Sequence, residues 1–276
     1  MILHIEQTIS NGSHLFRITE HNQLLFTANT PFFNPITPMV GGTFSKLTLE
    51  DPQGHTLFSS RAETMDNLRE SLKPLSYLFT GSKKLACYTI FDHNSQPHGA
   101  FFVEYSDLMK YKMVIAYHNT YISCYKRSLG RREVVSFYKD DTQVGQLTKP
   151  NCVVNNLDEY YLHFADGYEN LSGVLAFFVI YYDFLYHNNN GEYRKGGYDS
   201  NIRYTYDKNS AKYDKDFLRR QFGEAEEQRI DQWIRQTYAD APKNSNFDLK
   251  KFWLIFGIGW GVCILIALIV LLIVLL

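Results

Sequence analysis

The residues from Phe252 to Leu276 form an apolar run of 25 residues without a charged side chain, FWLIFGIGWGVCILIALIVLLIVLL. An α-helix rises 1.5 Å per residue, so about 20 apolar residues cross the hydrocarbon core of a bilayer. The alternative is a buried helix of a soluble core, but such helices normally keep a polar side. This run has no polar side, and we therefore expect a transmembrane helix over residues 252–276.

The flanks of this run predict its orientation. Lys250 and Lys251 directly precede it, and basic residues mark the cytoplasmic flank of a membrane helix. The start of the sequence, Met1 to Glu6, has no positive charge and no long apolar stretch, so we expect no signal peptide. Together these features predict a tail-anchored, single-pass membrane protein with a cytoplasmic N-terminal domain, which in a bacterium would lie at the cell membrane.

Gly257 and Gly261 form a G-x-x-x-G pattern within the predicted membrane helix. This spacing allows two membrane helices to approach closely, and would support a homodimer. Glycine is also common in membrane helices without such a contact. Both interpretations remain open at this point.

The first 165 residues predict antiparallel strands. Apolar and polar residues alternate in short runs between turn residues, and Tyr and Phe number 20 each, which favours strands. Three segments place Asp and Gly between apolar arms, as hairpins do: 47–58, 88–103 and 135–147. Successive hairpins of this kind fit a meander that closes into a barrel.

The segment 171–186 is apolar on nearly every side. As a helix it would be about 24 Å long, which is short for a membrane span, and Asp183 near its end would be costly in lipid. We expect a helix buried in protein, with a second membrane span as the alternative. Residues 187–213 are polar and predict a linker.

Residues 214–240 predict an amphipathic helix, with apolar side chains such as Phe217, Ile230 and Trp233 near one face and charges opposite. Such a helix can pack on the preceding domain. It can also lie along a membrane surface, because Trp and Phe oppose a charged face.

Hairpins with Asp-to-Gly turns, followed by one apolar helix at Val174–Tyr186, resemble the tubby C-terminal-like superfamily of tubby proteins, LURP-one-related proteins and phospholipid scramblases. The resemblance covers about residues 1–190. It implies a mainly β fold, a closed twelve-stranded antiparallel barrel wrapped around a central hydrophobic helix. It also implies binding linked to membrane lipid or nucleic acid, and no established catalysis.

The chain differs from that family pattern by adding segments after the helix. The predicted organisation is a barrel at 1–190 with its helix at 171–186, a polar linker with the amphipathic helix 214–240 at 191–251, and the anchor at 252–276.

Motifs of common enzymes are missing from the sequence. There is no H-E-x-x-H, G-x-S-x-G or P-loop pattern, and Cys87, Cys124 and Cys152 form no C-x-x-C pair. Asp92 and His98 lie in a polar stretch that favours a surface turn over a metal site. We therefore expect no enzyme activity, no cofactor and no metal. The net charge of -1 disfavours a nucleic-acid partner.

Two groups of basic residues are candidates for binding a lipid headgroup. Lys126, Arg127, Arg131 and Arg132 surround a turn at 128–130, while Lys110 and Lys112 alternate along a predicted strand. Solvated hairpin ends are one interpretation. The other is a site for anionic phospholipid, to which each Lys or Arg contributes about 1 kcal/mol near the membrane.

These features predict a membrane-tethered, tubby-like domain that binds lipid or a partner at the cytoplasmic face of the bilayer. Two alternatives remain. The chain could be a scramblase-like transporter of lipids, or an adaptor that recruits a soluble partner through helix 214–240.

Overall fold

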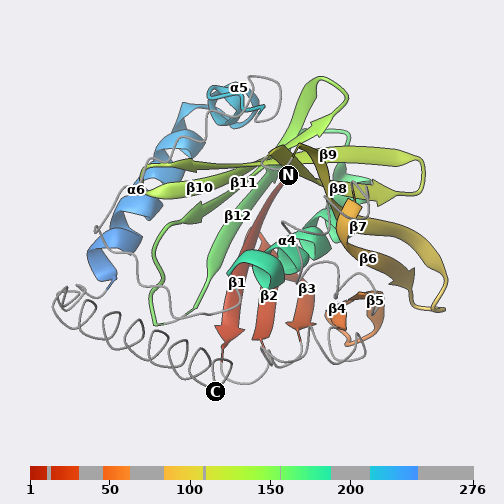
Figure 1. Cartoon of the computed structure of the whole chain (residues 1–276). Helices are drawn as coiled ribbons and strands as arrows, with labels where there is room; N and C mark the ends of the chain where they lie inside the picture. The colour runs from red at the N-terminus through yellow and green to blue at the C-terminus, as the bar shows by residue number, and fades with distance from the viewer. Residues whose placement is uncertain are drawn as a thin grey trace, which may run out of the picture. The chain divides into compact units, whose positions relative to one another are not determined.

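A computed structural model describes residues 1–10, 14–30, 46–62, 84–107, 110–155, 157–187 and 212–241. Twelve antiparallel strands in these ranges close into one barrel (Figure 1). Each strand pairs with the next along the chain, and β12 returns to pair with β1. The predicted mainly β fold with a closed antiparallel barrel is confirmed. The strands are β1 (Ile2–Ile9), β2 (His14–Glu20), β3 (Gln23–Thr30), β4 (Leu47–Glu50), β5 (Thr56–Ala62), β6 (Lys84–Asp92), β7 (Pro97–Asp107), β8 (Lys110–Tyr117), β9 (Thr120–Leu129), β10 (Arg132–Lys139), β11 (Thr142–Pro150) and β12 (Glu159–Phe164).

The seam between β1 and β12 closes the barrel. The register runs from Ile2 opposite His163 to Glu6 opposite Glu159. The amino group of Met1 donates a hydrogen bond of 3.1 Å to the carbonyl of Phe164. Successive side chains of a strand point to opposite faces, so Leu3 and Ile5 of β1 are buried in the core while their neighbours lie outside.

The three predicted hairpins are β4–β5, β6–β7 and β10–β11. In the first, Gly54 has a φ of +85°, and Asp51 accepts hydrogen bonds from the backbone N–H groups of Gln53 (2.9 Å) and His55 (2.8 Å). This turn uses Asp and Gly as predicted.

The turn role predicted for glycine is wrong in the other two hairpins. Gly99 lies inside β7 and Gly145 inside β11. A Cβ atom on Gly99 would lie 2.2 Å from the carbonyl oxygen of Ala116 on β8. At both positions glycine allows a neighbouring strand to approach, whereas Asp92 and Asp140 lie at the turns themselves.

The predicted apolar helix is present as a short 3-10 helix, η2 (Glu169–Leu171), followed by α4 (Ser172–Tyr186). Every α4 residue from Val174 to Asp183 is buried. Phe178 packs against Phe101 of β7 and Phe137 of β10, with ring centroids 5.7 and 5.5 Å apart. Burying each such ring stabilises the fold by about 1.5–3 kcal/mol. No helix in the described part of the chain is long and apolar enough to cross a membrane.

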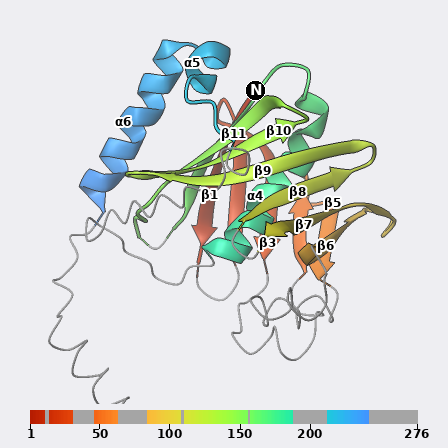
Figure 2. The same ribbon diagram turned by 45° about the horizontal axis from the view of Figure 1, so that its top comes forward.

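The predicted amphipathic helix is divided into α5 (Phe217–Phe222) and α6 (Glu224–Asp240). Gly223 lies between them with a φ of +88°, a conformation that ends a helix. Ile230 and Ile234 of α6 are buried, and the ring of Trp233 meets Tyr161 of β12 edge-on at 4.7 Å. Figure 2 shows α6 on the outside of the barrel. Its apolar face packs on the barrel within one compact unit, Met1–Ala241.

The predicted transmembrane helix 252–276, including Gly257 and Gly261, lies outside the described residues. Most of the predicted linker, residues 188–211, also lies outside them.

Candidate functional site

The four basic residues of the predicted cluster flank the tight turn between β9 and β10. Gly130 has a φ of +63° and occupies the turn with Arg131, while Arg132 pairs with Leu129 to close the hairpin. Lys126 and Arg127 lie further back on β9. The hairpin therefore brings these residues close together, but strand alternation sends their side chains to different places.

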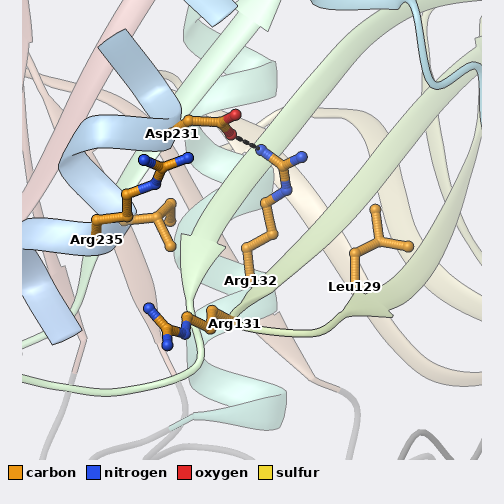
Figure 3. Close-up of a pocket in the computed structure, with 6 residues that line it drawn as sticks. Leu129, Arg131, Arg132, Asp231 and Arg235 are labelled. Atoms are coloured by element: carbon orange, nitrogen blue, oxygen red, sulfur yellow. Dashed lines mark hydrogen bonds and ion pairs between the residues drawn. The ribbon is translucent and has the colours of Figure 1, made fainter. Parts of the chain in front are cut away.

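An open pocket of about 190 Å³ lies between this turn and α6. Figure 3 shows the three arginines around it, Arg131 and Arg132 from the turn and Arg235 from α6, together with Asp231. Three guanidinium groups and one carboxylate leave the pocket with an excess of positive charge. Arg235 was not a predicted site residue, because no sequence pattern relates α6 to the β9–β10 turn. Leu129 and Ile234 complete the lining.

Contacts with other residues of the protein neutralise part of the positive charge in the pocket. Arg132 donates a hydrogen bond of 2.6 Å to Asp231, and the Arg131 guanidinium lies 5.4 Å from the ring centroid of Tyr238. Arg131 and Arg235 are both exposed, and neither forms an ion pair with a described residue. These two guanidinium groups are thus the ones most available to an anion.

The side chains of Lys126 and Arg127 point away from the pocket. The Nζ atom of Lys126 lies 2.8 Å from Glu133 and 4.6 Å from the ring centroid of Tyr186. Arg127 lies 5.6 Å above the ring of Tyr213. The structure therefore separates Lys126 and Arg127 from the pocket that Arg131 and Arg132 line.

The second predicted group does not form a continuous patch with the pocket. Lys112 forms an ion pair of 3.2 Å with Glu104 and donates a hydrogen bond of 3.1 Å to the Ser123 hydroxyl. Lys110 begins β8, but its side chain lies outside the described part of the structure.

A buried polar contact fixes α6 on the barrel, and sequence analysis did not find it. His163 of β12 is fully buried and lies 2.7 Å from Glu226, which also accepts hydrogen bonds from Arg229 at 2.6 and 2.7 Å. Burial opposes ionisation of Glu226, but Arg229 and His163 lower its pKa to about 2. The contact holds the α6 side of the arginine pocket in place.

A second buried network surrounds the C-terminal end of α4. Lys149 and Asp158 form a buried ion pair of 2.6 Å, and the Tyr160 hydroxyl donates to Asp183. Glu133 accepts from Tyr182 and pairs with Lys126 and with His187. Burial opposes ionisation of Glu133, but Lys126 and His187 hold its pKa well below its usual range. Apart from one oxygen of Asp183, the side chains named here pair with one another, which is typical of a structural network.

One set of described side chains has the chemistry of a metal site. His4, Glu6 and Glu159 place a ring nitrogen and two carboxylate oxygens within 4.8 Å of one another. The pair of Asp92 and His98, in contrast, belongs to a turn: Asp92 accepts from two backbone N–H groups and lies 3.0 Å from His98.

Comparison with protein-family models, with curated proteins and with solved structures gives no match. The resemblance to the tubby C-terminal-like superfamily therefore stays a prediction.

Proposed function

We propose that this protein is a membrane-anchored, non-enzymatic domain that binds the headgroup of an anionic phospholipid. The observation that carries the proposal is the pocket lined by Arg131, Arg132 and Arg235. Guanidinium groups match the geometry of phosphate oxygens, and exposed arginines keep this capacity available. Asp231 orients Arg132 and leaves the other two arginines for the ligand.

The position of α6 in the sequence supports this proposal. α6 ends at Asp240, and the predicted anchor begins at residue 252. The 11 residues between them span at most about 40 Å when fully extended. An inserted anchor would therefore tether the domain to the bilayer, which raises the effective concentration of lipid available to it. Lys250 and Lys251 favour the cytoplasmic leaflet.

The proposal includes a barrel whose interior is occupied by α4 as a central helix. Its support is the set of strands that α4 meets: Tyr181 packs against Tyr88 of β6, Phe177 against Phe58 of β5, and Asp183 accepts from Tyr160 of β12. A filled barrel has no room for a lipid chain inside, so a headgroup would bind on the outer surface.

Vesicle flotation of the compact unit Met1–Ala241 tests this proposal. We expect binding to vesicles that contain phosphatidylserine and little binding to neutral phosphatidylcholine vesicles. Replacing Arg131 and Arg235 together by Gln removes about 2 kcal/mol of attraction, which lowers the partition coefficient about thirtyfold.

Lys139→Gln is the matched control, because Lys139 is an exposed cation at the end of β10, away from the β9–β10 turn. If net charge alone drove binding, this single replacement would lose half of the free energy that the double replacement loses, about 1 kcal/mol or fivefold in the partition coefficient, and that result would contradict a role for the pocket.

The two alternative functions give different results. A scramblase-like transporter would move labelled lipid between leaflets of vesicles that contain the full chain. An adaptor would bind a soluble partner without anionic lipid; because Ile230 and Ile234 are buried, its contact would use the polar face of α6.

A further inference from the structure

Three side chains suited to metal binding meet on the outer face of the seam between β1 and β12. His4 and Glu6 are two residues apart on β1, so they point to the same face. Glu159 of β12 lies directly opposite Glu6 in the register. This seam joins the first and last strands of the barrel.

The distances among these groups are close to those of a zinc site. Nε2 of His4 lies 2.6 Å from Oε1 of Glu159, a hydrogen bond that a metal ion would replace, and 4.0 Å from Oε1 of Glu6. Two ligand atoms that share a tetrahedral zinc ion are about 3.3 Å apart, given metal–ligand distances of 2.0–2.2 Å. The two observed distances lie on either side of this value. Small rotations of the two glutamate side chains, which are 41% and 33% exposed, would equalise them.

The imidazole ring is already held in place. His4 stacks on Tyr161 with ring centroids 4.4 Å apart and an interplanar angle of 10°. Tyr161 is in turn fixed by the guanidinium of Arg229, 4.3 Å from its ring centroid, and by Trp233. A ring held in this way loses little conformational entropy when it binds a metal.

The charged side chains at the seam have opposite effects on cation binding: the two carboxylates favour it, and a nearby arginine opposes it. Glu6 and Glu159 are directly opposed carboxylates, an arrangement that destabilises a strand pair. A divalent cation between them would remove that repulsion. Arg17 of β2 lies opposite Glu6 on its other side, and its positive charge opposes cation binding there without forming an ion pair with Glu6.

We propose that His4, Glu6 and Glu159 bind a zinc ion that links β1 to β12. An imidazole and two carboxylates suit zinc, whereas calcium and magnesium prefer an all-oxygen shell. Three protein ligands leave a fourth position for water. The site stands apart from the arginine pocket and does not depend on lipid binding.

The test is zinc titration of the metal-free full chain in detergent micelles by isothermal calorimetry. We expect one high-affinity zinc ion per chain and no comparable heat with magnesium. Glu6→Gln and His4→Gln should each weaken zinc binding at least tenfold. Arg17→Gln should strengthen it, because a neighbouring positive charge is removed.

His55→Gln is the matched control, because His55 pairs with the single carboxylate of Asp51 at 3.0 Å on the β4–β5 hairpin. Its zinc affinity should equal that of the unmodified chain. The proposal is overturned if the unmodified chain binds no zinc, or if Glu6→Gln and His55→Gln bind it equally well.

A separate measurement covers the case in which His4→Gln does not fold. Cobalt substituted for zinc in the unmodified chain should give the absorption spectrum of a tetrahedral site with nitrogen and oxygen ligands. An octahedral spectrum with only water-like ligands would contradict coordination by the three side chains.

Discussion

Asp183 is a carboxyl group with no exposed surface, on the last turns of α4. One oxygen accepts a hydrogen bond from the Tyr160 hydroxyl, and the other has no hydrogen-bond partner among the described residues. Burial, together with the negative charge of Asp158, raises the pKa of Asp183 well above its usual value, despite Tyr160 and Lys149. Burial therefore disfavours the ionised form of this residue in the folded chain, whereas the unfolded chain carries no such penalty.

We expect Asp183→Asn to stabilise the protein at neutral pH. A carboxyl group whose pKa is raised by folding lowers the free energy of unfolding as the pH rises above its unfolded value, because the unfolded chain releases the proton more readily. The amide keeps an oxygen acceptor for Tyr160 and carries no such cost. Urea unfolding at pH 7 measures the difference. A large loss of stability would mean that Asp183 is ionised and paired with Lys149 in the folded state.

At the scale of elements, the packing of β7 against β8 depends on Gly99. The Cβ position of Gly99 points at the backbone of β8, 2.2 Å from the Ala116 oxygen and 3.0 Å from the Cα of Tyr117. Backbone atoms cannot rotate away as a side chain can. A methyl group at this position must separate the two strands.

Replacing a turn glycine of positive φ costs up to about 2 kcal/mol. Gly99→Ala should destabilise the protein by more than this, because two strands must separate. Gly54→Ala is the comparison: Gly54 has a φ of +85° but open space at its Cβ position, so it should cost only about 1–2 kcal/mol. Thermal unfolding of the two variants ranks them. An equal loss of stability in the two variants would show that the backbone of β8 moves at Ala116 to accommodate the methyl group.

The elements that sequence predicted are those whose cause is local. Alternation and Asp turns located the hairpins, and continuous apolarity located the helix at 171–186. Gly99 and Gly145 were misplaced, because close approach by a neighbouring strand is not visible in a local pattern. For the same reason, only part of the pocket lining was predicted from the sequence. Arg131 and Arg132 share a turn, but Arg235 joins them only through docking of α6, which depends on His163 and Glu226.

At the scale of the whole molecule, three half-buried or buried histidines respond to pH together. Burial lowers the pKa of His14, His163 and His187, although Asp158, Glu226 and Glu133 respectively oppose the shift. As pH falls below 6.5, the unfolded chain takes up protons at these positions that the folded chain does not. Stability is therefore lost as the pH falls. The raised pKa of Asp183 acts in the opposite direction.

We expect the free energy of unfolding to decrease between about pH 7 and pH 5, by at most about 4 kcal/mol per pH unit, the limit for three histidines, with Asp183 offsetting part of this decrease. Glu133 and Glu226, with lowered pKa values, contribute only below about pH 4.5. Urea unfolding across this range measures the slope. His163→Gln should reduce it, with His93→Gln at an exposed turn as the control; a stability that rises toward pH 5 would contradict the prediction.

The seam between β1 and β12 has a consequence for how the chain is made. His4 and Glu159 are in contact but 155 positions apart in the sequence. During synthesis β1 leaves the ribosome first, and its final partner emerges only after every other strand. Until then the barrel is an open sheet with an unpaired edge, which is prone to pair with other chains. We therefore expect closure to be a late step, and the interval before it to be the time when this chain is most exposed to aggregation.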